Sequence, residues 1–349
     1  MRKALTMMLE SDPGIKVIGS ARNGEEGVAK VKQLKPDLVT MDVEMPQMDG
    51  LAALRQIMKT NPVPVMMVSS ITTDGAKATL EALELGAVDF IPKQMSYVSL
   101  DIVKIKDDLL AKIKDIVRRK HVLMARYKTR SSFTQAAAPA GAKVIPPAQK
   151  QGYVLPGKRR HKIDIIAIGS STGGPPALQT VIPQLPRNLP VGVIVSQHMP
   201  PMFTKSLAER LDTISKVSVH EAEDGEPIEP GTVLVAPGGK HLTVKRYGGK
   251  ARAVVSEEPS TTLYKPCVDV MFTSVAAAYA RTCMGVVLTG MGNNGLVGAR
   301  KIKQTGGIMI AQNEETCVVY GMPRAVAEAE LTDHVAPIEY VAGEITSYF

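Results

Sequence analysis

The chain contains no tryptophan, and aromatic residues make up only 4% of its 349 residues. Proteins that bind single-stranded nucleic acid stack the bases on aromatic side chains, so this shortage argues against that class of function. The three cysteines, Cys267, Cys283 and Cys317, match no metal-ligand spacing, and so small and odd a number is typical of free thiols in a reducing compartment. The sequence shows no signal-peptide pattern and no run of roughly 18 apolar residues, the length that a membrane span needs. We therefore expect a cytoplasmic protein without a membrane segment.

The positive charge of the chain, +8 in total, is concentrated in one segment. Residues 112–162 hold fourteen Lys or Arg side chains and a single acid, a net charge of +13, which leaves −5 for the rest. Most of this segment, from 131 onward, is rich in Pro, Gly, Ala and Lys without a hydrophobic period, which is typical of a solvated linker. The distribution favours a linker over a nucleic-acid site, so we expect no nucleic-acid partner. The linker divides the chain into a domain at 1–120, the linker itself at 121–160 and a domain at 161–349.

Helices and strands alternate through the N-terminal domain, which predicts a doubly wound α/β fold with a parallel sheet. The predicted strands are 15–21, 37–43, 63–70 and 88–93, and the predicted helices are 1–14, 23–36, 51–62, 74–87 and 98–120. Three polar residues, Asp42, Ser69 and Lys93, stand where successive strands end. In such sheets the carboxyl ends of the strands meet at one edge and carry the chemistry. We therefore expect these three side chains to lie together.

The C-terminal domain alternates in the same way, and we expect a second doubly wound α/β fold there with a short β insertion near 230–256. Its predicted strands are 163–169, 191–197, 218–223, 232–238, 251–256, 285–290 and 306–312, and its predicted helices lie near 175–184, 201–214, 268–281, 293–304 and 323–330. The sequence contains no internal repeat.

One predicted strand runs into the sequence IIAIGSSTGG at 165–174, which two prolines follow. A glycine-rich turn between a strand and a helix can cradle a phosphate on its backbone amides, or it can present a serine as a nucleophile. Ser and Thr can also serve there only as helix caps, and the turn alone leaves the three interpretations open. His198 follows the apolar strand 191–197, where a general base would stand, although such a histidine is often structural. A third turn, VLTGMGNNGLVGA at 287–299, could bind phosphate or stabilise an oxyanion, and it lacks the lysine of a P-loop.

Residues 1–120 resemble a response-regulator receiver domain. The resemblance is carried by TMDVEMPQMDGL at 40–51, by Ser69 and by Lys93. It implies that Asp42 is the phosphoryl acceptor, Ser69 the switch hydroxyl and Lys93 the lysine that contacts the phosphate.

The chain departs from the receiver pattern at its beginning. Receivers usually open with a central strand that ends in two acids holding Mg²⁺, whereas this sequence opens with a predicted helix, MRKALTMMLE. We therefore expect a start upstream of Met1, a strand 15–21 without its neighbour, and an incomplete magnesium site. We also expect poor uptake of phosphoryl groups by Asp42.

Three strand-end loops, GSSTGG, SQHMPP and TGMGNNG, follow the receiver and the linker in this order. With them, the chain is similar over nearly its whole length to the chemotaxis-receptor methylesterase family, which the stretches VAPGGKH, KPCVDVMF and AQNEETCVVYGMPR also resemble. The resemblance implies a serine hydrolase that removes methyl esters from glutamates and deamidates glutamines of chemoreceptor cytoplasmic domains, with no cofactor for the hydrolysis. It assigns Ser171 as the nucleophile, His198 as the general base and the backbone amide of Met291 as an oxyanion donor. It also implies a chemotaxis histidine kinase as a partner, and a receiver that covers the active-site face until Asp42 is phosphorylated.

Asn294 stands where this family has the aspartate that orients the histidine. An asparagine amide can turn and donate to Nδ1 of His198, which puts the proton on Nε2, the nitrogen that should accept from Ser171. In a serine protease the same change lowers kcat by about 10⁴, so we expect Asn294→Asp to raise kcat by about 10²–10⁴, unless a nearby acid such as Asp269 substitutes. The alternatives are a catalytically weakened homologue that binds receptors or a kinase, and a nucleotide-binding module built on the glycine-rich loops.

Overall fold

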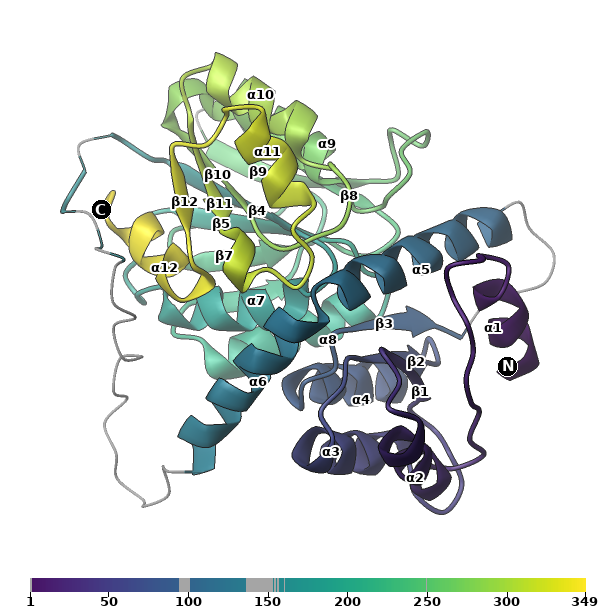
Figure 1. Ribbon diagram of the computed structural model, residues 1–349. Helices are drawn as coiled ribbons and strands as arrows, with labels where there is room; N and C mark the ends of the chain where they lie inside the picture. Colours follow the sequence, from purple (N-terminus) through teal and green to yellow (C-terminus); the bar gives the residue numbers. More distant parts are fainter. Residues whose placement is uncertain are drawn as a thin grey trace. The chain divides into compact units, whose positions relative to one another are not determined.

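The computed structural model describes residues 2–93, 101–135, 153, 155, 157–159, 161–248 and 250–349. The chain forms an N-terminal unit, Met1–Ala138, and a C-terminal unit, Pro139–Phe349 (Figure 1). Within the described ranges, no helix is both long and apolar enough to cross a membrane.

The N-terminal unit is built around a parallel three-stranded sheet in the order β1-β2-β3. Its strands are β1 (Val39–Asp42), β2 (Val65–Ser69) and β3 (Asp89–Pro92), and its helices are α1 (Arg2–Leu9), α2 (Gly24–Leu34), α3 (Gly50–Thr60), α4 (Thr73–Glu84), α5 (Asp101–Arg118) and α6 (Lys120–Gln135). The helices α2, α3 and α4 begin at polar caps, because the side chains of Asn23, Asp49 and Thr72 each accept a hydrogen bond from a backbone amide of the first turn. The middle strand, β2, is buried along its whole length, as expected of a parallel strand covered on both faces.

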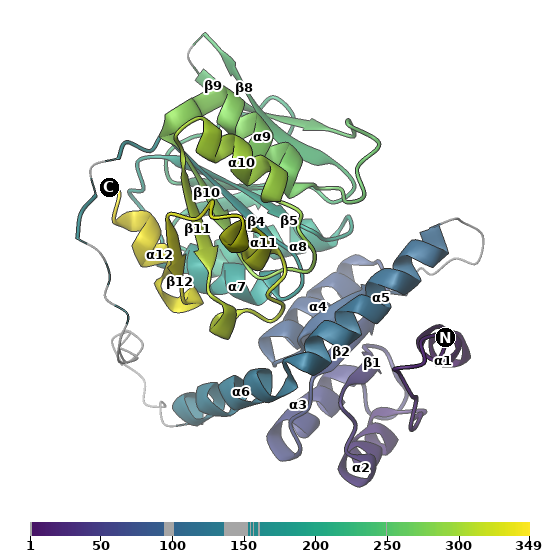
Figure 2. The same ribbon diagram turned by 45° about the horizontal axis from the view of Figure 1, so that its top comes forward.

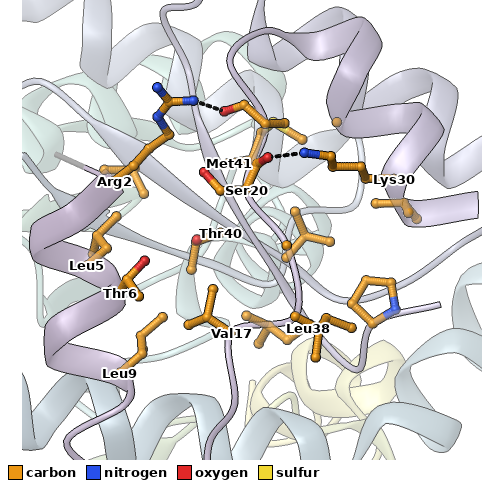
Figure 3. A pocket seen from close by; sticks show the side chains of 18 of the residues that line it. Arg2, Leu5, Thr6, Leu9, Val17, Ser20, Lys30, Leu38, Thr40 and Met41 are labelled. Atoms are coloured by element: carbon orange, nitrogen blue, oxygen red, sulfur yellow. Dashed lines mark hydrogen bonds between the residues drawn. The ribbon is translucent and has the colours of Figure 1, made fainter. Parts of the chain in front are cut away.

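The strand predicted at 15–21 is not formed. These residues all lie within the described range, and none belongs to a sheet. Together with α1 and β1 they line a cavity of about 880 Å³, and Figure 3 shows side chains of α1, such as Leu5 and Leu9, and of Val17 and Leu38 around it. A strand needs a partner backbone about 4.8 Å away. Residues 15–21 pair with no strand, as expected of a segment without its neighbour, and they line this cavity together with β1.

The first part of the predicted linker, 121–160, is helical, because α6 extends to Gln135. Residues 136–152 lie outside the described residues. Sequence analysis missed α6 because this helix has little amphipathic character, so no 3.6-residue hydrophobic period marks it. Part of the basic charge here is neutralised, since Lys120 pairs with Asp37 at 2.9 Å.

Seven parallel strands form the sheet of the C-terminal unit, in the order β12-β11-β10-β4-β5-β7-β6. The strands are β4 (Ile165–Ser170), β5 (Gly192–Gln197), β6 (Ser218–Glu221), β7 (Thr232–Val235), β10 (Cys283–Val287), β11 (Ile308–Gln312) and β12 (His334–Ala336). From β4 the sheet extends one way through β5 and the other way through β10, so the strand order reverses beside β4. In open parallel sheets, ligands bind at such a reversal, beyond the carboxyl ends of the strands.

Helices cover both faces of this sheet, and the predicted doubly wound α/β fold is confirmed. The helices are α7 (Gly174–Val181), α8 (Phe203–Ile214), α9 (Val268–Tyr279), α10 (Leu296–Gln304), α11 (Met322–Glu328) and α12 (Ile338–Thr346). Figure 2 shows α9 and α10 on one side of the sheet and α7 and α12 on the other. An antiparallel hairpin of β8 (His241–Tyr247) and β9 (Lys250–Ser256) packs against α9. Of these elements, β12 and α12 were not predicted, and β8 lies within the β insertion that the sequence predicts near 230–256.

The last residues of the predicted linker are tied to α12. Glu344 of α12 is 1% exposed, and its carboxylate accepts hydrogen bonds from Tyr153 Oη at 2.5 Å and from Arg159 Nη2 at 2.8 Å. Arg159 also donates to Tyr348 Oη at 2.9 Å, and the ring of Tyr153 stacks on Tyr340. Burial, together with the bond to Glu344, raises the pKa of Tyr153 above its usual value. This buried cluster fixes where the chain enters the C-terminal unit.

Candidate active site

The turn after β4 carries two serines, and their surroundings distinguish them. Ser170 ends β4, is fully buried, and donates from its hydroxyl to Gln197 Oε1 at 2.6 Å. Ser171 is 8% exposed, and its backbone amide donates to Thr289 O at 3.0 Å. A nucleophile needs a hydroxyl that the substrate can reach, so the geometry favours Ser171 over Ser170.

Glycines shape this turn. Gly173 is the N-cap of α7 and has a φ of 75°, in the left-handed region that favours glycine. A Cβ on Gly174 would lie 1.9 Å from Gln197 Oε1, so a larger residue there would displace that side chain. Because the cap of α7 is a glycine, the interpretation of the neighbouring Ser and Thr as helix caps does not hold.

Two buried polar side chains, which sequence analysis missed, connect the strand-end loops. Gln197 ends β5 and donates from Nε2 to the carbonyl oxygens of Ser171 at 2.9 Å and His198 at 3.2 Å. Thr289 follows β10 and donates from its hydroxyl to the carbonyl oxygen of Thr172 at 2.9 Å. Their only signal in the sequence was a polar residue at the end of an otherwise apolar strand. Both side chains hold the backbone of the serine turn against its neighbours.

His198 is the first residue after β5, and its backbone amide donates to Ser170 O at 3.1 Å. This bond places the histidine beside the serine turn. Its ring stacks on Tyr264, a residue that sequence analysis missed, with ring centroids 4.3 Å apart and planes inclined by 13°. Its Nε2 lies 2.9 Å from Asn294 Oδ1. The sequence predicts that Nδ1 faces residue 294, and the structure corrects this, because the ring presents Nε2 to Asn294.

Asn294 lies in the loop between β10 and α10 and presents its oxygen to the histidine. Asn294 Oδ1 accepts from the backbone amide of Val268 at 2.7 Å as well as from His198 Nε2 at 2.9 Å. A backbone N–H can only donate, so the atom bonded to Val268 has to be the oxygen. The expectation that the Asn294 amide would turn its nitrogen toward His198 is therefore wrong.

The same loop carries Met291, the predicted oxyanion donor. Gly290 directly precedes it, and a Cβ on Gly290 would lie 2.9 Å from Ser171 Cβ. Gly290 is itself held by a backbone bond to Val319 O at 3.1 Å. The Met291 amide therefore belongs to the residue next to Gly290, whose backbone closely approaches the predicted nucleophile.

In the N-terminal unit, the strand ends bring Asp42 and Lys93 together. Lys93 Nζ lies 2.8 Å from Asp42 Oδ1 and 2.9 Å from Glu44 Oε2, and Glu44 was not predicted. Burial by itself would lower the pKa of Lys93, but its hydrogen bonds to the two carboxylates raise it, and the bond from Lys93 lowers the pKa of Glu44. Ser69 is fully buried and donates to Gly75 O at 3.0 Å. Its hydroxyl is thus bonded to α4 and does not join the Asp42–Lys93 pair.

The residues around Asp42 form an incomplete site for a magnesium ion. Mg²⁺ takes carboxylate oxygens and waters as ligands, whereas the carboxylates of Asp42 and Glu44 are both bonded to the ammonium group of Lys93. In the part of the chain that the structure describes, no group of three or more His, Cys, Asp or Glu side chains could hold a metal ion.

Comparisons with known proteins match both units. Residues 166–345 match the CheB methylesterase family, and residues 1–102 match the response regulator receiver domain. A protein-glutamate methylesterase/protein-glutamine glutaminase of Oleidesulfovibrio alaskensis is 49% identical over 99% of this chain and 95% of its own length. A protein of the same name from Pyrococcus abyssi is 42% identical over 98% of this chain and 88% of its own. The crystal structure of the Thermotoga maritima CheB methylesterase catalytic domain matches with a TM-score of 0.52 and 45% identity, over 53% of this chain and 97% of that one. The chain therefore belongs to the CheB methylesterase family and carries a response regulator receiver domain ahead of the methylesterase domain.

Proposed function

We propose that this chain hydrolyses methyl esters on glutamate side chains of chemoreceptor cytoplasmic domains, and that it also deamidates glutamines there. The observation that carries the proposal is the convergence of Ser171, His198 and Asn294 beyond the ends of β4, β5 and β10, where the strand order reverses. The names of the relatives support both reactions. Such substrate segments lie in the cytoplasm, and we propose that the chain acts there.

In the proposed reaction, the Ser171 hydroxyl oxygen attacks the ester carbonyl carbon and forms a C–O bond, while its proton passes to His198. Because Nε2 of His198 is bonded to Asn294, Nδ1 is the nitrogen that accepts this proton. The backbone amide of Met291 donates to the oxyanion that develops on the carbonyl oxygen.

The tetrahedral intermediate then loses its leaving group. The C–OCH₃ bond breaks, and the methoxy oxygen takes the proton from His198 and leaves as methanol. Water attacks the remaining acyl-enzyme and gives a proton to His198. The new intermediate breaks its bond to Ser171, which recovers the proton, and the free glutamate is released. With glutamine as substrate, the leaving group is ammonia.

The test is methanol release from a methylated receptor cytoplasmic fragment. Ser171→Ala should lower kcat at least about 10³-fold, to the residual rate that the oxyanion hole and substrate binding support without a nucleophile. Ser170→Ala, the neighbouring serine whose hydroxyl is bonded to Gln197, should lose less than about tenfold, because it removes one neutral hydrogen bond. Equal rates for the parent chain and Ser171→Ala would contradict the proposal. Receptor binding without turnover would then favour a regulatory homologue.

We further propose that the receiver domain regulates this hydrolase, with Asp42 accepting a phosphoryl group from a chemotaxis histidine kinase. The receiver match and the contact of Lys93 with Asp42 at 2.8 Å support this role. The lysine would neutralise the charge of the bound phosphoryl group. Replacing Asp42 by Asn should abolish any labelling by a phosphorylated kinase, and labelling that persists would contradict the assignment.

A further inference from the structure

Asn294 has a charged partner on the side away from His198. Its Nδ2 donates to Asp269 Oδ2 at 2.9 Å, and Asp269 lies in the first turn of α9. The other carboxylate oxygen, Oδ1, accepts the backbone amide of Gly298 in α10 at 2.8 Å. A continuous chain of hydrogen bonds therefore runs from His198 through Asn294 to Asp269.

The two ends of the Asn294 side chain face partners of opposite and fixed polarity. On the oxygen side, the Val268 amide can only donate. On the nitrogen side, the Asp269 carboxylate accepts from Nδ2 at 2.9 Å, and Nδ2 also lies 3.1 Å from Cys267 Sγ. A turned amide would place its nitrogen against one donor and its oxygen against a carboxylate, and would lose both bonds. The two partners together hold the oxygen of Asn294 toward His198.

Asp269 also brings the charge that asparagine lacks. When Ser171 gives up its proton, His198 becomes a positively charged imidazolium. Asn294 can accept its Nε2–H but carries no negative charge to offset it. The Asp269 carboxylate lies two hydrogen bonds from the ring, and the amide between them passes on its polarisation.

We propose that Asp269 is a positioning residue of the hydrolase, which orients the Asn294 amide and supplies, through it, the negative charge that an orienting aspartate would provide directly. This inference rests on the proposed function of Ser171 and His198. In a Ser-His-Asp triad a single carboxylate both orients the histidine and offsets its positive charge. Here the two tasks are divided between Asn294 and Asp269.

A merely structural role for Asp269 has to be separated from this one, because Oδ1 also holds the start of α10. Asp269→Asn makes the separation. Its side-chain oxygen can still accept from Gly298, but its NH₂ group then faces the NH₂ group of Asn294. Exchanging the two residues, Asp269→Asn with Asn294→Asp, restores the bond between positions 269 and 294 with its direction reversed, and gives up only the weak donor contact of Nδ2 with Cys267 Sγ at 3.1 Å. The carboxylate then at position 294 would accept from Val268, His198 and residue 269, and the amide oxygen at position 269 would still accept from Gly298.

The experiment compares the parent chain, Asp269→Asn, the exchange variant and a control, Asp212→Asn. Asp212 is a matched control, since its carboxylate also accepts a backbone amide, that of Val219 at 2.8 Å. Methanol release from the methylated receptor fragment gives kcat and KM. Asp269→Asn should lower kcat by about 10- to 100-fold, with KM within about twofold. This is the loss typical of removing a residue that orients a metal-ligating side chain by a hydrogen bond, which is a comparable task. The exchange variant should recover at least the parent kcat, and the control should leave kcat unchanged.

A second readout does not depend on turnover. In ¹⁵N-histidine spectra, with His198 assigned by His198→Gln, the parent ring should carry its proton on Nε2. Asp269→Asn should move part of the population to the Nδ1–H tautomer, and the exchange variant should restore the parent spectrum. An unchanged tautomer and kcat in Asp269→Asn, or an exchange variant no better than Asp269→Asn, would overturn the proposal. If the parent releases methanol no faster than Ser171→Ala while the tautomer shifts as described, the proposed function fails and the positioning role stands.

Discussion

The single substitution Asn294→Asp tests how the amide functions in this site. An aspartate at this position keeps both acceptor contacts of Asn294 Oδ1, with Val268 N at 2.7 Å and His198 Nε2 at 2.9 Å. It loses the donor bond to Asp269, and it brings a second carboxylate to the place where Nδ2 lies 2.9 Å from Asp269 Oδ2. The change therefore adds a favourable charge on one side and an unfavourable one on the other.

The two charge effects are of similar size, because the two contacts have the same length of 2.9 Å. With an effective dielectric constant of about 20, two unit charges at this separation interact by about 6 kcal/mol. The repulsion from Asp269 is present before and during the reaction, so it does not itself oppose the attraction to the imidazolium in kcat. It acts instead by making the two carboxylates share one proton, so that the pair carries the same single negative charge as Asp269 does in the parent chain. Since the parent amide already presents its oxygen to His198, no tautomer has to be corrected. We expect Asn294→Asp to raise kcat by about tenfold or less, well below the 10²–10⁴ that sequence analysis predicted.

The assay is steady-state methanol release from freshly purified protein. Freshness matters because Asn294 precedes a glycine, and an Asn-Gly pair can form a succinimide, so a peptide mass map should establish that residue 294 is undamaged. Asn293→Asp is the matched control, because it adds the same charge at the exposed neighbouring position and should change kcat little. A rise of 10² or more in Asn294→Asp alone would refute the reasoning. It would mean that the amide of the active enzyme presents its nitrogen to His198.

Three further results are expected. Glu344→Ala should lower the free energy of unfolding of the C-terminal unit by about 2–4 kcal/mol, because it leaves the largely buried Arg159 without its carboxylate partner. Calorimetry of thermal unfolding measures this change, and an unchanged transition would contradict it. Acetyl phosphate with Mg²⁺ should label Asp42 poorly and change methanol release little, because among the described residues Asp42 belongs to no acidic group suited to hold the metal. Stoichiometric labelling on a phosphate-affinity gel would show the reasoning wrong. Gly174→Ala should lower kcat at least about tenfold, because its Cβ would lie 1.9 Å from a buried glutamine that holds the serine turn, whereas Gly157→Ala, where the space is open, should behave like the parent chain.

Hydrophobic periodicity predicted most of the fold, and it failed where partners distant in sequence decide the structure. The buried strands of the C-terminal unit, such as β4 and β5, are continuous apolar runs, which a parallel sheet covered on both faces requires. Residues 15–21 have the composition of a strand but pair with no other strand. The local pattern alone predicted a strand there, and only the departure from the receiver pattern indicated that its neighbour is missing. The prediction missed helix α6 for the opposite reason, because this helix forms without the amphipathic period that would have marked it.

The positions of the candidate site residues followed from one rule of parallel sheets. Polar residues at the ends of strands β4, β5 and β10 converge because those strands are neighbours. The rule predicts where the backbone of each residue lies, but not the direction in which its side chain points. The bond between Ser170 and Gln197, which leaves Ser171 as the accessible hydroxyl, depends on a contact between two strands. The stacking of Tyr264 on His198 depends on a contact between two loops that are distant in sequence.

The asparagine at position 294 illustrates why a substitution in a motif does not by itself predict loss of activity. The histidine of a hydrolase needs an acceptor that fixes its tautomer and a negative charge that offsets the imidazolium. A single aspartate meets both needs, so sequence analysis predicted the loss of both unless a nearby acid such as Asp269 substitutes. In this fold, the amide of Val268, 26 residues away in sequence, fixes which atom of Asn294 faces His198. The carboxylate of Asp269, 25 residues away, lies directly behind it. The two needs are separable in space, and the effect of the asparagine therefore depends on the start of α9 as much as on the loop that contains it.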